Sequence, residues 1–334
     1  MNLQSVIQCI LPHLARVDVV SPAARPVLRR AVSVLAALGL AVSAFGLAPG
    51  AQAQTRVNIG YVSATDFLPA MIAKERGFFE RHGIDATLTR VALAPNVAAA
   101  IISGDMQIGM STGPILVQAV ENGLGLVAIA GAAHFRKDNP IVSVVARPAA
   151  KIATAADLRG KRVGVPGLRS LLHVLFQKWL LQNNIPLNQV TMVEAPFPQM
   201  KDLLAGGTLD AVVAIEPIRS RILADSTGMK VADFVGEVNP DILAAFWMAG
   251  TDWVAKNPKA VQGFRDALRE AIDFARSNPT EARTIEAKYL TVVSPVTPSW
   301  QVDLSRGEFD FMVKLSAEMG LTRQSVDPDR LFLK

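Results

Sequence analysis

The chain has 334 residues, of which 50% are hydrophobic and 19% are charged. This length suits two lobes better than one, since single cores stop growing at about 250–300 residues, and the composition excludes a small staple-dependent scaffold and a disordered chain. Residues 1–53 hold four Arg and one Asp, which leaves 30 of the 34 basic and 28 of the 29 acidic residues elsewhere, a balance that excludes a polyanion-binding protein.

The N-terminal segment has the order of a secretory signal peptide. Arg29 and Arg30 precede an uncharged stretch, 31–48, which is followed by the small residues Ala51 and Ala53. We expect cleavage after Ala53 and a periplasmic protein, exported by the general or the twin-arginine route. The alternative is an anchoring helix, because eighteen apolar residues are just enough to span a bilayer.

The sequence predicts neither a disulfide nor a metal site. Its only cysteine, Cys9, precedes the expected cleavage site and lies too far before the apolar stretch to be a lipid-anchored cysteine. His82 and His173 have no partners at metal-ligand spacing. No phosphate-binding loop, dinucleotide fingerprint or nucleophile elbow is present, so we expect no cofactor and no catalysis. No run of basic residues is interleaved with aromatic ones, so with the nearly balanced charge we expect no nucleic-acid partner.

After residue 53, strand patterns and helix patterns alternate. The predicted strands are 56–61, 84–91 and 106–110, and the predicted helices between them are 67–76 and 96–103. Strands separated by helices indicate βαβ units with a mostly parallel sheet.

The same pattern begins again near residue 160. Gly104–Ile108 matches Gly207–Ala211 at an offset of about 103 residues, and the helix after 162–165 has an apolar stripe that we expect to face a core. The stripe comprises Leu168, Leu171, Leu172, Leu175, Phe176 and Trp179. Two lobes of similar topology are therefore predicted.

The chain returns to the first lobe at its end. We expect 141–146 and 245–249 to be two crossings between the lobes, followed by C-terminal helices that include a buried stripe from Val261 to Ala275. The predicted division is 1–53 signal peptide, 54–140 first part of lobe 1, 141–245 lobe 2, and 246–334 return strand and C-terminal helices of lobe 1.

Several motifs carry a resemblance to a known family. They are Ala73–Phe79, Asp157–Val165, Leu209–Ala211, Glu216-Pro217 and Asn257-Pro258. Together they resemble the substrate-binding proteins of ABC importers of the nitrate, sulfonate and taurine type, a branch that also includes binders of thiamine pyrimidine precursors. The resemblance covers residues 56–320. It implies the type II periplasmic-binding fold with two hinge crossings, a monomer, and two partners, an ABC permease and its ATPase subunit.

The candidate ligand site follows from the strand-to-helix turns, because ligands of open parallel sheets lie outside the carboxyl ends of the strands. The candidate residues in these turns are Thr65, Asp66, Ser111, Thr112, Gly113, Gly167, Arg169, Ser170 and Glu216. Helix N-termini and Arg169 indicate a small organic anion, a sulfonate or a carboxylate. Neutral aromatic or pyrimidine ligands remain open.

Each candidate also has a structural interpretation. The Ser and Thr residues could be helix caps, and Arg169 could be a solvated charge. Glu216 could accept from a cationic ligand or interact with a helix dipole. Either Phe246 or Trp247 could wall the cleft, and we select Trp247. The basic tetrad 134–137 could border the cleft or form a solvated loop.

The predicted function is a periplasmic solute receptor that delivers a small ligand to a membrane permease. Two alternatives are an enzyme of the same fold related to thiamine pyrimidine synthesis and a membrane-tethered sensory domain.

Overall fold

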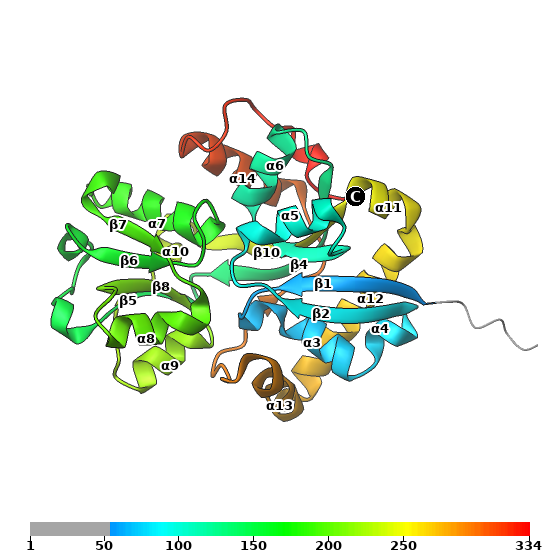
Figure 1. Cartoon of the computed structure of the whole chain (residues 1–334), viewed down its shortest axis with the longest axis horizontal. Helices are drawn as coiled ribbons and strands as arrows, with labels where there is room; N and C mark the ends of the chain where they lie inside the picture. Colours follow the sequence, from blue (N-terminus) through cyan, green and yellow to red (C-terminus); the bar gives the residue numbers. More distant parts are fainter. Residues whose placement is uncertain (1–53) are drawn as a thin grey trace, which may run out of the picture. The chain divides into compact units, whose positions relative to one another are not determined.

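The computed structural model describes residues 54–334 (Figure 1). The predicted signal peptide, its cleavage site and the alternative membrane anchor lie outside the described residues. Within 54–334, no helix combines the length and the apolar character needed to cross a membrane.

The first sheet has six strands in the order β11-β4-β10-β3-β1-β2. Their bounds are β1 Thr55–Tyr61, β2 Ile84–Arg90, β3 Ile108–Ser111, β4 Leu126–Arg136, β10 Asp241–Gly250 and β11 Ser299–Trp300. β1 pairs in parallel with β2 and β3, whereas β10 runs antiparallel to β3 and β4. We call this sheet and the helices packed on it lobe 1.

The second sheet has five strands in the order β7-β6-β8-β5-β9. They are β5 Val142–Ala146, β6 Arg162–Val165, β7 Thr191–Glu194, β8 Ala211–Ile215 and β9 Met229–Ala232. β6 is parallel to β7 and β8, and β5 is antiparallel to β8 and β9. This sheet and its helices, the green segment of Figure 1, are called lobe 2.

Helices connect the strands and cover the sheets (Figure 1). In lobe 1 the α-helices are α3 Leu68–Glu75, α4 Phe78–Arg81, α5 Pro95–Ser103, α6 Gly113–Glu121, α11 Thr251–Lys256, α12 Pro258–Ser277, α13 Pro279–Leu290 and α14 Arg306–Glu318. In lobe 2 they are α7 Leu171–Gln182, α8 Met200–Ala205, α9 Ile218–Ala224 and α10 Val235–Val238. Short 3-10 helices span Thr65–Phe67, Pro148–Ala150, Ala155–Leu158, Leu187–Gln189, Phe197–Gln199 and Pro328–Arg330.

The predicted α/β architecture of two sheets flanked by helices is confirmed, but the sheets are mixed rather than mostly parallel. The reason is the path between the lobes. The carboxyl ends of the parallel strands of each sheet face the other lobe. A strand that enters a sheet from that side must run against them, as β5 and β10 do.

The chain leaves lobe 1 through residues 137–141, after β4, and returns through 239–240, before β10. These two connections are neighbours, since the backbone N–H of Lys137 donates to the carbonyl of Pro240 over 2.9 Å. The strands that were expected to cross between the lobes, 141–146 and 245–249, each lie within one sheet.

The apolar stripes form the cores of the lobes. In α12 the stripe from Val261 to Ala275 is buried, and Phe264 stacks on Phe79 with ring centroids 5.6 Å apart. In lobe 2, Phe176 packs against Trp179 and Phe234. The inclusion of Leu168 in the α7 stripe is wrong, because the helix begins at Leu171 and Leu168, in the turn before it, is 42% exposed.

Candidate ligand-binding site

A pocket lies between the two lobes, where the carboxyl ends of their parallel strands face each other. It holds about 470 Å³ of space free of atoms, part of which is open to solvent. Its lining residues are Val62, Ala64, Asp66, Phe67, Ala92, Ala94, Met110, Thr112, Phe135, Ala244 and Ala245 from lobe 1, and Pro166, Ser170, Leu171, Leu172, Phe197 and Ile215 from lobe 2. The candidate residues come from four strand-to-helix turns, 63–66, 111–113, 166–170 and 214–216, and each of these turns contributes at least one residue to the lining. In the first three turns a predicted site residue does so.

The lining is mostly apolar. Asp66, Thr112 and Ser170 are its polar side chains, and Phe67, Phe135 and Phe197 contribute aromatic rings. Within the described part of the chain, no Lys, Arg or His is among the residues that line this pocket.

Asp66 is the one acidic side chain of the lining. It lies in the 3-10 helix Thr65–Phe67, which follows β1 after a short turn, and is only 3% exposed. Its Oδ1 atom is buried and accepts no hydrogen bond from any residue in 54–334. Burial raises the pKa of Asp66 to about 7, because a charged carboxylate loses its hydration there.

Thr112 and Ser170 begin helices on opposite sides of the pocket. The Thr112 hydroxyl oxygen accepts a hydrogen bond from the backbone N–H of Leu171 over 3.2 Å, a contact between the lobes. This bond leaves the hydroxyl hydrogen of Thr112 for another acceptor. The Ser170 hydroxyl donates to the carbonyl of Gly167 over 2.8 Å, so its oxygen can still accept.

Three other predicted polar residues are buried beside the pocket but do not line it. Thr65 donates through its hydroxyl to Glu286 over 2.6 Å, and Ser111 is fully buried. The Glu216 carboxylate accepts from Ser220 over 2.8 Å and lies 3.3 Å from Nε of Arg219. These contacts hold Glu216 within the protein rather than toward a ligand.

The two predicted glycines allow close packing. A Cβ at Gly113 would lie 2.3 Å from Cγ of Met312, so the start of α6 can approach α14 only without a side chain. Gly167 has a φ of 140°, and a Cβ there would lie 2.9 Å from Cδ of Pro95 in the other lobe. Gly167 therefore permits the closest approach of the loop before α7 to α5.

Arg169 is exposed and does not line the pocket. Its guanidinium donates to the side-chain carbonyl of Gln118 in α6 over 3.3 Å, while its backbone N–H donates to Nδ1 of His173 over 3.0 Å. Burial lowers the pKa of His173 to about 4, which keeps that nitrogen an acceptor. Arg169 thus connects the lobes outside the pocket.

Trp247 lies in the core of lobe 1, 1% exposed, between Phe67 and Phe264. Phe246 is equally buried against Phe309. The structure brings neither ring to the pocket, which β10 lines through Ala244 and Ala245 instead.

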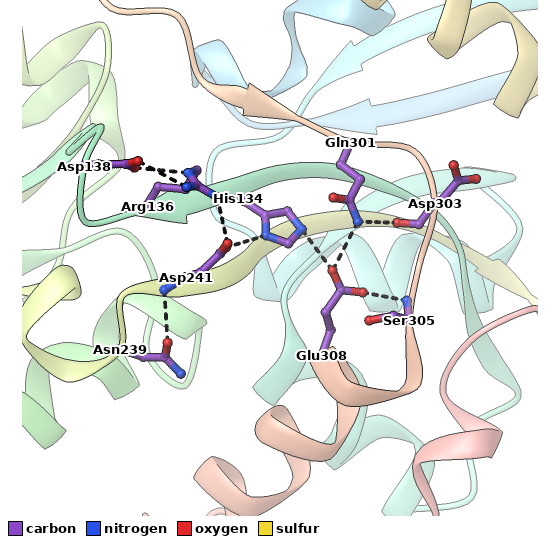
Figure 2. Close-up of polar contacts among 9 residues, drawn as sticks. All are labelled: His134, Arg136, Asp138, Asn239, Asp241, Gln301, Asp303, Ser305 and Glu308. Atoms are coloured by element: carbon purple, nitrogen blue, oxygen red, sulfur yellow. Dashed lines mark hydrogen bonds and ion pairs between the residues drawn. The ribbon is translucent and has the colours of Figure 1, made fainter.

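In the basic tetrad 134–137, the side chains of His134 and Arg136 pair with carboxylates (Figure 2). His134 has Nδ1 2.8 Å from Asp241 and Nε2 2.9 Å from Glu308, and the Arg136 guanidinium contacts Asp138 and Asp241. Burial opposes the charged form of His134, but its bonds to Glu308 and Asp241 outweigh that effect and raise its pKa. From this tetrad only Phe135 lines the pocket.

Further contacts join the lobes around the pocket. The backbone N–H of Thr65 donates to the carbonyl of Glu216 over 3.2 Å, and Nζ of Lys178 in α7 lies 2.6 Å from Oε2 of Glu318 in α14. Residues 54–334 contain no group of three His, Cys, Asp or Glu placed to hold a metal ion.

The apolar lining residues were not predicted. Val62, Met110 and Phe197 are apolar, as core residues are, so residue type alone does not distinguish them from the core. Only their positions at or just after the ends of strands could have indicated that they line the pocket. Asp66, Thr112 and Ser170 are the predicted residues that the structure places in the lining.

The profile of the family described as NMT1/THI5 like matches residues 64–282. A protein of Brucella abortus (strain 2308), named as a binding protein, is 27% identical over 240 residues, which are 71% of this chain and 72% of that protein. The nitrate import ATP-binding protein of Synechocystis is 27% identical over 252 residues, 70% of this chain and 37% of that protein.

Among solved structures, the alkanesulfonate-binding protein of Xanthomonas axonopodis pv. citri, bound to MOPS, has the same fold. The superposition has a TM-score of 0.72 at 17% identity and covers 84% of this chain and 98% of that one.

Proposed function

The chain belongs to the NMT1/THI5-like family, and we propose that it is the solute receptor of an ABC importer, which captures one small organic molecule between its lobes and delivers it to a membrane permease. The observation that carries this proposal is the pocket, because both lobes line it with the residues at their strand ends. A ligand that contacts both lobes favours their closed arrangement by its differential affinity.

The relatives support binding rather than catalysis. The Brucella and Xanthomonas proteins are named for binding, and the Synechocystis protein for import. We infer that ATP hydrolysis occurs on a separate subunit, since this sequence contains no phosphate-binding loop.

In this proposal the receptor is periplasmic and monomeric, and it begins at Gln54 after export. In this proposal the two lobes move relative to each other about the connections 137–141 and 239–240. The first connection adjoins the predicted domain boundary at 141. The second connection lies before the predicted domain boundary at 245. N-terminal sequencing of the exported protein tests the location. A chain that still carries residues 1–53 would favour the membrane-tethered alternative.

Ligand identity is tested by thermal unfolding of the purified protein with sulfonates, nitrate, aromatic acids, pyrimidines and amines. At a ligand concentration a hundredfold above the dissociation constant, we expect a stabilisation of about 2.7 kcal/mol, measured as a higher melting temperature. If no class of compound changes the melting temperature, the receptor function is contradicted. Turnover of a compound would instead favour the enzyme alternative.

A pair of matched variants shows whether the binding uses the pocket. Ala92 lines the pocket and is also exposed to solvent, so the larger side chain of Ala92→Phe should occupy part of the space and weaken binding at least tenfold. Ala255 in α11 is also exposed and does not line the pocket, and Ala255→Phe should leave the affinity unchanged. Equal affinities for both variants would place the ligand elsewhere.

A further inference from the structure

Among the described residues that line the pocket, one side chain is ionisable, the buried carboxyl group of Asp66, and the other polar side chains are the hydroxyls of Thr112 and Ser170. Asp66 is 3% exposed, lines the pocket and has a buried oxygen, Oδ1, without a hydrogen-bond partner in the described chain. Buried polar groups in proteins are normally paired, so an unpaired carboxyl in a pocket indicates a partner that arrives with the ligand. The partner of a carboxyl oxygen is a hydrogen-bond donor.

The helices that begin near the pocket offer fewer backbone N–H donors than helix N-termini usually present. Proline occupies the second position of α3 and of α6, as Pro69 and Pro114, and the first position of α5, as Pro95. Proline has no backbone N–H. In α7 the N–H of Leu171 is already bonded to Thr112. The N-termini that would hold an anion are therefore partly without donors.

The charges near the pocket lead to the same conclusion. No positively charged residue of 54–334 is in the lining, Arg169 bonds Gln118, and the His134 and Arg136 side chains pair with carboxylates (Figure 2). An anion would lose its hydration without gaining a counter-charge, and it would lie near Asp66. A cationic donor would instead pair with Asp66.

The shape of the lining indicates the rest of the ligand. Phe67, Phe135 and Phe197 come from three different elements, and the remaining side chains are mainly Ala, Val, Leu, Ile and Met. Such walls bind flat, apolar groups.

From these observations we propose that the pocket selects a small aromatic nitrogen base, a flat molecule with an amine or amidine group, and that Asp66 is the residue that recognises this group. The assignment rests on the proposed receptor function and names its ligand class.

Three probes of nearly equal shape test the charge preference. Benzamidine, benzamide and benzoate each place a planar polar group on one ring, and they differ in carrying a positive, no and a negative charge. We expect calorimetric affinities in the order benzamidine, benzamide, benzoate. Benzoate binding as tightly as benzamidine would overturn the proposal.

Two variants test the role of Asp66. Asp66→Asn keeps the size of the side chain but removes its charge, and we expect a loss of benzamidine affinity of about tenfold or more. Asp85→Asn, at an exposed carboxylate of β2, is the control and should bind as the unchanged protein does. Equal affinity of the Asp66→Asn variant and the unchanged protein would overturn the assignment.

The pH dependence separates recognition by Asp66 from a general effect on folding. Benzamidine affinity should fall by on the order of tenfold per pH unit below about 7, where Asp66 takes up its proton, and should stay level in the Asp66→Asn variant. The same slope in both proteins would contradict the proposal.

The wider solute screen distinguishes failure of this assignment from failure of the receptor function. If none of the three probes binds but another compound does, that compound is compared in the unchanged protein and in Asp66→Asn. An anion bound equally by both overturns the ligand class and leaves the receptor function intact. If no compound of any class binds, the receptor function itself fails.

Discussion

At the scale of residues, sequence position identified the turns but not the roles of the side chains in them. Thr65 and Asp66 are adjacent and both buried, yet Thr65 donates to Glu286, whereas Asp66 lines the pocket and has one buried oxygen without a hydrogen-bond partner among residues 54–334. The difference comes from a residue more than two hundred positions away, which a local motif cannot reveal. Burial of a carboxyl oxygen without a hydrogen-bond partner lowers the stability of the folded protein. In the proposed receptor it also leaves the Asp66 carboxyl free to bind a ligand.

Asp66→Asn should therefore stabilise the ligand-free protein at pH 8. In the folded chain the carboxyl keeps its proton up to about 7, whereas an unperturbed Asp loses it near 3.8. Between these values the folded state binds more protons, so its free energy of unfolding falls as the pH rises. The Asp66→Asn variant has no such titration, so it should avoid this decrease in the free energy of unfolding, which is on the order of 4 kcal/mol at most. Urea unfolding at pH 4 and pH 8 measures it. An equal difference at both pH values would contradict the argument.

At the scale of elements, helix stripes were predictable and strand directions were not. The α12 stripe is buried as predicted because helical spacing alone places its residues on one face. The antiparallel direction of β10 depends on where the chain re-enters lobe 1, and this is a property of the whole path. Beside β10, His134 of β4 lies between Asp241 of β10 and Glu308 of α14 (Figure 2).

His134→Phe should destabilise lobe 1 more at pH 6 than at pH 9. The raised pKa of His134 means that its stabilising charge is fully present below the ordinary value of 6.5 and is lost as the pH rises through the folded-state value. We expect a loss of about 1–3 kcal/mol at pH 6, typical of charged hydrogen bonds. Thermal unfolding across this range measures it. His82→Phe, at a histidine beside Glu270, is the comparison, and a pH-independent loss at His134 would contradict the prediction.

At the scale of the whole molecule, the lobes meet through a few specific contacts around the pocket. Leu171 bonds Thr112, Arg169 bonds Gln118, and Gly167 approaches Pro95 where a Cβ would have too little space. These contacts join residues from separate halves of the internal repeat. They limit how closely the two lobes can approach each other.

Gly167→Ala should weaken ligand binding by about tenfold, because the added methyl group separates the loop before α7 from α5. The control is Gly160→Ala in the same lobe, where φ is also positive, at 73°, but a Cβ meets nothing within 4 Å. Both variants should lose about 1–3 kcal/mol of stability through backbone strain. Only Gly167→Ala should lose affinity for the ligand found in the screen, as measured by calorimetry. Equal affinity losses would show that strain, not the lobe contact, is responsible.

The sequence by itself determined the repeated α/β pattern, the family resemblance and the turns that meet at the pocket, because spacing, capping and apolar periodicity act over short stretches of chain. Only the tertiary structure decided the mixed strand directions, the enclosure of Trp247 in the core, the pairing of His134 and Arg136, and the isolation of Asp66. Charge compensation and desolvation depend on neighbours from distant parts of the chain, so the charges that surround the pocket can be read only when both lobes are in place.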